Sequence, residues 1–144
     1  MKVRDILRKK GSEVATIRPD STVSTAANLL TLKGIGALVV SEDGSQVDGI
    51  LSERDIVRGL VNHGREIMEL PVADLMTRTV RTCNLGADIT EVMSEMTRSR
   101  IRHLPVVEDT ELRGIISIGD VVKNRLDELE TETSVLRDYI VGRV

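Results

Sequence analysis

The chain has 144 residues, a formal net charge of −3 and one aromatic residue, Tyr139. This length suits one ordinary domain or two very small ones, and a single cysteine excludes an internal disulfide framework. The acidic balance and the lack of aromatic platforms argue against nucleic acid as a partner. The longest apolar run, residues 37–40, is too short to span a membrane, and the N-terminus shows no signal-peptide pattern, so we expect a cytoplasmic protein.

Hydrophobic periodicity and turn residues predict six elements in the first half of the chain. Asp20 or Ser21 is the expected N-cap of the amphipathic helix, and the turn at residues 42–45 predicts a hairpin. In chain order the elements are a leading helix at 3–9, a strand at 14–17, an amphipathic helix from Val23, strands at 37–41 and 47–52, and a helix from Glu53.

The second half repeats this order. Residues 72–76, 80–82, 101–106 and 114–120 align with residues 3–7, 14–16, 35–40 and 49–55, and the length changes fall in expected loops. The predicted elements are a short helix at 72–76, a strand at 80–83, a helix from Ile89 capped by Asp88, strands at 103–108 and 112–117, and a helix from Ile118 to about Tyr139. The chain therefore divides into a repeat at 1–64, a repeat at 65–126 and a helical extension at 127–144.

The last helix carries an apolar stripe with heptad-like spacing that outruns its repeat. It is either a surface helix that lies on its own domain or a dimerisation arm, and an uncovered stripe favours the arm. The residues of the stripe are Val122, Leu126, Leu129, Thr133, Leu136 and Ile140.

The duplicated β-α-β-β-α unit, the Gly-h-h-Ser-x-x-Asp segment in both copies and the run Leu104-Pro105-Val106-Val107 resemble a tandem pair of CBS domains, regulatory modules first recognised in cystathionine β-synthase. The resemblance covers about residues 1–126. It implies an α+β fold in which two CBS repeats pack about a pseudo-twofold axis, with a long C-terminal helix. It also implies two clefts that bind adenosine-containing ligands, AMP foremost, with ATP, ADP, NAD or S-adenosylmethionine as alternatives.

The two Ser-x-x-Asp motifs, Ser52–Asp55 and Ser117–Asp120, have two compatible interpretations. Each resembles a capping box that opens the following helix. Given the resemblance, each aspartate could also accept hydrogen bonds from the ribose hydroxyls, while the serine and the helix N-terminus favour a phosphate.

Phosphate needs cations, and the resemblance places Arg102 and His103 beside the nucleotide. Arg102 is the first candidate for a phosphate ligand and Arg54 the second, because guanidinium pairs bidentately with phosphate. Copy one has Gly36 and Ala37 at the matching positions, which predicts a less basic cleft there. The remaining expected contacts, to the base, are Thr16, Ile17 and Ala37 in one cleft and Thr82, Cys83 and Pro105 in the other.

The sequence contains no phosphate-binding loop, no His-Glu-x-x-His and no Cys/His cluster, so we expect neither an enzyme nor a metal site. The first hypothesis is an adenine-nucleotide sensor that signals to a separate protein and forms a homodimer. The alternative is a ligand-independent dimerisation or protein-interaction module, in which Ser-x-x-Asp only caps helices.

Overall fold

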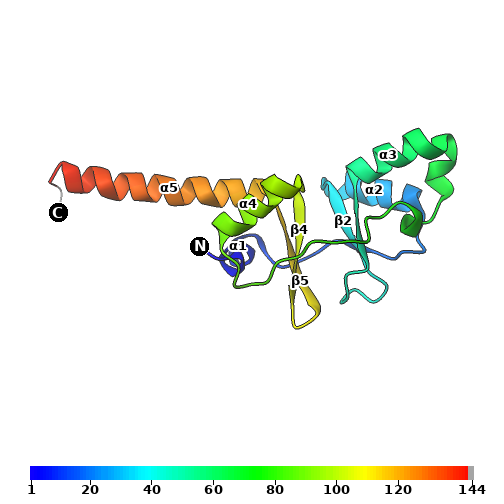
Figure 1. Cartoon of the computed structure of the whole chain (residues 1–144), viewed down its shortest axis with the longest axis horizontal. Helices are drawn as coiled ribbons and strands as arrows, with labels where there is room; N and C mark the ends of the chain where they lie inside the picture. Colours follow the sequence, from blue (N-terminus) through cyan, green and yellow to red (C-terminus); the bar gives the residue numbers. More distant parts are fainter. Residues whose placement is uncertain (143–144) are drawn as a thin grey trace.

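Two small sheets, one in each half of the chain, form the framework of the molecule (Figure 1). The computed structural model describes residues 1–142. In the first half, β1 (Thr16–Ile17) runs parallel to β2 (Ala37–Val40), which pairs antiparallel with β3 (Gly49–Ser52). Helices α2 (Val23–Lys33) and α3 (Glu53–His63) accompany this sheet. The predicted order of elements is confirmed here.

The start of α2 differs from the prediction. Its N-cap is Thr22, whose hydroxyl oxygen accepts a hydrogen bond from the backbone N–H of Thr25 at 3.2 Å. Asp20 lies too early to cap the helix, and its carboxylate instead accepts from the guanidinium of Arg18.

The second half is built on the antiparallel hairpin of β4 (His103–Glu108) and β5 (Glu111–Ser117). Asp109 and Thr110 join the strands with positive φ angles of 51° and 65°, as a two-residue type I′ turn requires. Helices α4 (Ile89–Ser99) and α5 (Ile118–Ile140) complete this half, and Asp88 caps α4 as predicted.

The predicted strand at 80–83 is wrong. Only Cys83 pairs with β4, through one parallel bridge to Val106. The backbone N–H of Val80 donates a local hydrogen bond to the carbonyl oxygen of Arg78 instead. The predicted helix at 72–76 is reduced to the 3-10 turn η2 (Val72–Asp74), which follows the 3-10 helix η1 (Gly64–Glu69).

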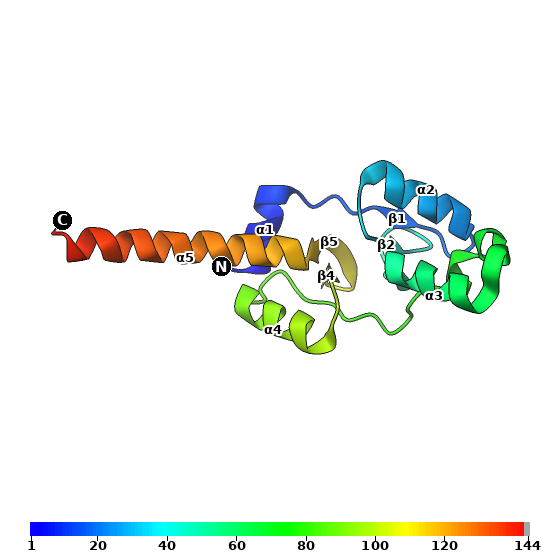
Figure 2. The same ribbon diagram turned by 90° about the horizontal axis from the view of Figure 1, so that it is seen from above.

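The leading segments of the two repeats are exchanged. Helix α1 (Val3–Lys10) buries Val3, Ile6 and Leu7 in the core of the second half, and Val72 lies in the core of the first. Figure 2 shows α1 beside α5, far from β1 and β2.

The backbone hydrogen bonds that hold the two exchanged segments in place are equivalent under the pseudo-twofold symmetry. The N–H of Val3 donates to Ala87 at 2.9 Å, and the N–H of Val72 donates to Ser21 at 2.7 Å. A glycine in β3 or in β5 admits each exchanged side chain. A Cβ on Gly49 would lie 2.7 Å from Sδ of Met76, and one on Gly114 would lie 2.7 Å from Cδ1 of Leu7.

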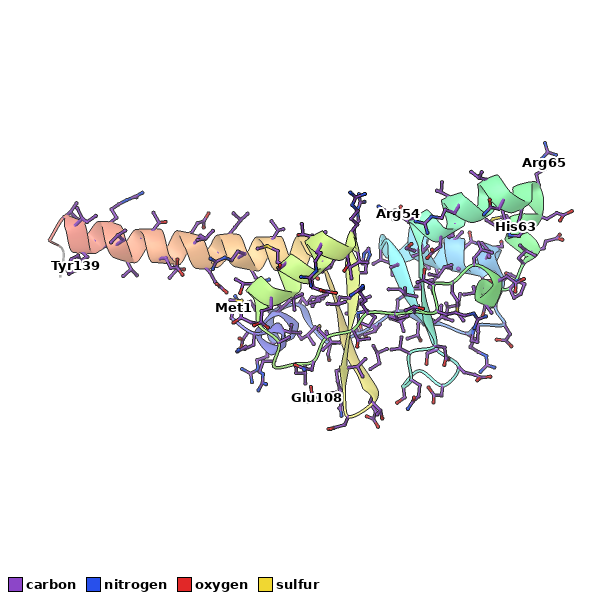
Figure 3. All side chains as sticks on the ribbon, viewed as in Figure 1. Met1, Arg54, His63, Arg65, Glu108 and Tyr139 are labelled. Atoms are coloured by element: carbon purple, nitrogen blue, oxygen red, sulfur yellow. The ribbon has the colours of Figure 1, made fainter. Side chains whose placement is uncertain are left out.

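Helix α5 packs on α4 and α1 at its start and then projects away from the rest of the molecule (Figures 1 and 2). Figure 3 shows Tyr139 near its far end. Every described residue from Leu129 onward is exposed. Among residues 1–142, no helix is long and apolar enough to cross a bilayer.

Candidate functional site

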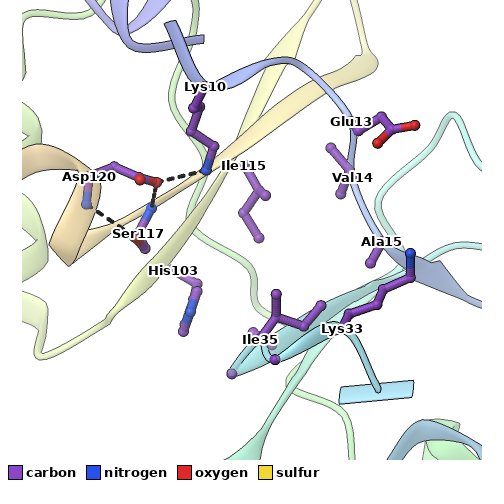
Figure 4. A pocket seen from close by; sticks show the side chains of 13 residues that line it. Lys10, Glu13, Val14, Ala15, Lys33, Ile35, His103, Ile115, Ser117 and Asp120 are labelled. Carbon is purple, nitrogen blue, oxygen red and sulfur yellow. Dashed lines mark hydrogen bonds and ion pairs between the residues drawn. The ribbon is translucent and has the colours of Figure 1, made fainter. Parts of the chain in front are cut away.

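Two cavities lie where the two halves meet, and each takes residues from both repeats. The Asp120 cavity, of about 620 Å³, is shown in Figure 4. Its polar lining comprises Lys10, Glu13, Lys33, His103, Ser117 and Asp120, and its apolar walls include Val14, Ala15, Ile35, Ala37 and Ile115. The Asp55 cavity, of about 550 Å³, has as polar lining Ser52, Glu53, Arg54, Asp55, Arg58, Thr77, Ser99, Arg100, Arg102 and His103, with Ala37, Ile50 and Ile101 as apolar walls.

Asp120 is held by the start of α5 and by a lysine from α1. It forms the expected capping box with Ser117, whose N–H donates to Oδ2 at 2.9 Å. The ammonium of Lys10 donates to the same Oδ2 at 2.7 Å. Burial acts to raise the pKa of Asp120, but the Lys10 and Ser117 hydrogen bonds outweigh it and hold that pKa below its usual value. Asp120 is therefore a carboxylate at neutral pH, beside a cation that a phosphate could also bind.

Asp55 occupies the matching position at the start of α3, with different partners. It forms a capping box with Ser52, whose N–H donates to Oδ2 at 2.9 Å. The hydroxyl of Thr77 donates to Oδ1 at 3.2 Å, and the guanidinium of Arg58 lies 4.0 Å from Oδ1. The side chain of Asp55 is only 8% exposed. Asp55 thus accepts a hydrogen bond from a neutral hydroxyl, whereas Asp120 accepts one from the ammonium of Lys10.

The Asp55 cavity is the cationic one. Arg54, Arg58, Arg100 and Arg102 face two carboxylates there, whereas two lysines balance two carboxylates in the Asp120 cavity. Figure 3 shows Arg54 at the junction of the halves.

The expectation that the cleft of copy one is less basic is therefore wrong. In the pseudo-twofold packing, the Ser-x-x-Asp motif of each repeat lies beside the start of the central strand of the other repeat. The motif of Asp55 lies beside the start of β4, and the motif of Asp120 lies beside the start of β2. Arg102 consequently lines the Asp55 cavity and not the Asp120 cavity, whereas Gly36 and Ala37 line both.

Arg100 has a strained backbone at the edge of the Asp55 cavity. It ends α4 in the left-handed region, with φ 54° and ψ 41°. The matching residue at the end of α2 is Gly34, with φ 62° and ψ 40°. Glycine is the usual choice at such a position, so an arginine there places a cation at a cost in backbone energy.

His103 forms a wall common to both cavities, together with Gly36 and Ala37. A Cβ on Gly36 would lie 3.2 Å from Cε1 of His103 and 3.0 Å from Oε1 of Glu53, so this wall is closely packed. Burial lowers the pKa of His103, and the nearby carboxylate of Glu53 opposes that shift. The two cavities are thus neighbours across one neutral imidazole.

The structure brings eight of the thirteen predicted site residues to these cavities. Neither cavity is lined by the other five. Thr16 is half-buried in β1, Ile17 and Pro105 are buried within strands, and Thr82 is exposed. Cys83 is half-buried, and burial raises the pKa of its thiol to about 11. The cavities instead take Lys10, Lys33, Arg58, Thr77 and Arg100, which the sequence reasoning missed. Of these, only Arg100 had a visible signal, because it aligns with Gly34.

Comparison with known proteins places the chain in a family. The CBS domain family model matches residues 3–62 and 72–127, so the chain belongs to the CBS domain family and carries two copies of that domain. This confirms the resemblance, and CBS domain pairs are regulatory ligand-binding modules. Stand-alone CBS domain proteins are generally regulatory rather than catalytic.

Three relatives illustrate the match. The CBS domain-containing protein CBSX3, mitochondrial, of Arabidopsis thaliana is 34% identical over 97% of this chain and 72% of its own. The crystal structure of a CBS-domain containing protein from Agrobacterium tumefaciens is 42% identical, with a TM-score of 0.83, and covers 87% of this chain and 99% of its own. The CBS domain pair of protein MJ0100, in complex with 5-methylthioadenosine and S-adenosyl-L-methionine, is 25% identical with a TM-score of 0.77, covering 89% and 98%. These structures confirm the predicted α+β fold.

Proposed function

We propose that this chain is a regulatory module that binds an adenosine-containing ligand between its two CBS repeats and signals to a separate protein. One observation carries the proposal. The lining of the Asp55 cavity combines the carboxylate of Asp55, at the N-terminus of α3, with four arginines and with aliphatic side chains. We also propose that the chain has no catalytic role and acts in the cytoplasm.

Each part of such a ligand has a counterpart in this cavity. A carboxylate oxygen has two lone pairs, so Asp55 can accept a ribose hydroxyl while it keeps its bonds to Ser52 and Thr77. Arg102 and its neighbours offer guanidinium groups to a phosphate. Ile50 and Ile101 provide apolar surface for the adenine ring. Because the phosphate would neutralise the excess cations, AMP is the ligand we propose first, ahead of ADP, ATP and NAD.

The Asp120 cavity suits a less charged ligand. Its lysines and carboxylates balance, and Lys10 already pairs with Asp120. S-adenosylmethionine, which has no phosphate, fits this charge distribution better than AMP does. The complex described for protein MJ0100, which contains 5-methylthioadenosine and S-adenosyl-L-methionine, supports this class of ligand.

Binding in either cavity would fix the relative position of the halves, because each cavity takes residues from both. A ligand that prefers one arrangement shifts the equilibrium towards it, and a partner protein could detect the change. The shared His103 wall is the shortest route by which one cavity could influence the other.

Thermal unfolding with AMP, ADP, ATP, NAD and S-adenosylmethionine tests the proposal. A ligand at 100 times its dissociation constant stabilises the folded state by about 2.7 kcal/mol, which for a chain of this size raises Tm by roughly 5–10 °C. Asp55→Asn and Asp120→Asn keep the size of the side chain and one capping oxygen. Each is expected to remove the response of its own cavity only.

Unchanged Tm values with all five ligands would refute the sensor. That outcome would favour the alternative, a ligand-independent dimerisation or interaction module, for which the exposed stripe of α5 is the supporting observation.

A further inference from the structure

The projecting part of α5 exposes apolar side chains that its own domain does not cover. Leu136 is 59% exposed and Ile140 is 73% exposed. Their stripe begins at Val122 and Leu126, which are also exposed although they lie beside the helix's own domain. The projecting part of α5, residues 129–140, is short enough to be only marginally stable as an isolated helix in water, so its apolar stripe indicates a partner surface.

The stripe has the residue types of a two-stranded coiled coil. With Leu126 as an a position, the next a positions are Thr133 and Ile140, both β-branched. The d positions are Val122, Leu129 and Leu136. β-branched residues at a, as at Thr133 and Ile140, together with leucine at d, as at Leu129 and Leu136, favour two parallel strands.

The charges beside the stripe select a parallel pair of identical helices. In a parallel coiled coil, a g residue of one helix faces the e residue five positions later in the other. This rule sets Arg125 against Glu130 of the second copy and Glu132 against Arg137 of the second copy. Both combinations are attractive, and the symmetry of a dimer doubles each.

The antiparallel alternative is repulsive. If the helices ran in opposite directions with the same apolar matching, e would face e. Glu130 would then face Glu130 of the second copy, and Lys123 would lie near Arg137 of the second copy. Opposite charges specify partner and orientation, and like charges act against the wrong one.

The Glu132–Arg137 contact has the larger role of the two. Arg125 already donates to Glu128 of its own helix at 2.9 Å and would have to divide its bonds. Within residues 1–142, neither Glu132 nor Arg137 has an ion-pair partner. Both are available to a second copy.

We propose that residues 122–140 of α5 form a parallel, in-register, two-stranded coiled coil with α5 of a second copy of this chain. The part of this coil from Leu129 onward projects away from both ligand cavities (Figure 1). This proposal does not depend on the identity or even the existence of a nucleotide.

The mass of the full chain in solution tests the pairing. Analytical ultracentrifugation at tens of micromolar is expected to give twice the mass of one chain. Leu136→Glu places a charge on the stripe, beyond the packed part of α5, and is expected to give a monomer in which both repeats stay folded. The matched control, Ser134→Glu, changes a b position on the opposite side and should remain a dimer. A parent chain that is monomeric, or a Leu136→Glu variant that is still dimeric, would refute the coil.

Charge reversal and cross-linking test the orientation. Glu132→Arg and Arg137→Glu should each weaken the dimer roughly threefold to tenfold, and the double variant should recover most of the loss. With Cys83 replaced by alanine, Leu126→Cys and Ile140→Cys should each form a disulfide between copies, since in-register a positions face each other. In an antiparallel pair these positions are too far apart to cross-link, so that failure would overturn the proposed orientation.

A competing dimer face lies on α3, where Val57, Leu60 and Val61 are exposed. Val61→Glu is expected to leave the dimer intact. If it dissociates the dimer while Leu136→Glu does not, the chains pair through α3 and the coiled coil is excluded.

Discussion

Replacement of Arg102 by glutamine is expected to weaken the binding of AMP about tenfold and to leave the binding of adenosine unchanged. Arg102 lines the Asp55 cavity in company with three other arginines. Its proposed role is to pair with the phosphate, which adenosine lacks. The ribose and the base would be bound by Asp55 and the aliphatic walls, which the substitution does not touch.

The magnitude follows from where Arg102 lies. A hydrogen bond to a charged group contributes about 1.5–3 kcal/mol. Arg102 is exposed at the edge of the cavity, and Arg54, Arg58 and Arg100 can partly replace it, so the lower end of this range applies. A loss of about 1.4 kcal/mol is a factor of ten in dissociation constant.

Isothermal titration calorimetry of both ligands against the parent and the variant measures this difference directly. The matched control is Arg113→Gln on β5, an exposed arginine that pairs with Glu111 and lines neither cavity. Because exposed charges are screened, added salt should weaken AMP binding more in the parent than in Arg102→Gln. Equal losses for AMP and adenosine, or no loss for AMP, would refute the assignment of Arg102 to the phosphate.

Three further predictions concern stability. Leu7→Ala should lower the free energy of unfolding, measured in urea, by about 2–4 kcal/mol, because Leu7 is buried against Gly114 across the exchange; a loss below about 1 kcal/mol would contradict that packing. Burial lowers the pKa of His103 in the folded state below its ordinary value of 6.5. The contribution of His103 to the free energy of unfolding should therefore be complete above pH 6.5 and be lost as the pH falls from there through the lower, folded-state pKa. His103→Gln should flatten the dependence of the free energy of unfolding on pH over that range. Arg100→Gly should raise the free energy of unfolding by about 1 kcal/mol and weaken AMP binding, whereas Gly34→Arg, at the equivalent position, should be destabilising.

The elements and the repeat could be predicted because their signals are local. Helical spacing, turn residues and the Ser-x-x-Asp caps depend on neighbours within a few positions, and the capping boxes of Ser52 and Ser117 are confirmed. The strand at 80–83 is the exception, because its alignment with residues 14–16 predicts a strand but supplies no partner for it. Only Cys83 reaches β4, and a strand exists only where a partner strand supplies hydrogen bonds.

The composition of each cavity could not be predicted from local signals. Lys10 and Asp120 are 110 positions apart, and only the exchange of α1 brings them within 2.7 Å. In the same way, Arg102 precedes the Ser-x-x-Asp motif of its own copy in the sequence. The pseudo-twofold packing assigns it to Asp55 of the other copy.

Because the leading segments are exchanged, the hydrophobic core of each half contains side chains from the leading segment of the other repeat. A single repeat could cover its buried face only by trading its leading segment with a second molecule, and such a pair would fall apart on dilution. Joining two repeats in one chain supplies the partner at a fixed effective concentration. We therefore expect a chain nicked within residues 64–71 to persist as a complex of two fragments, and the intact chain to lose both sheets in one cooperative step.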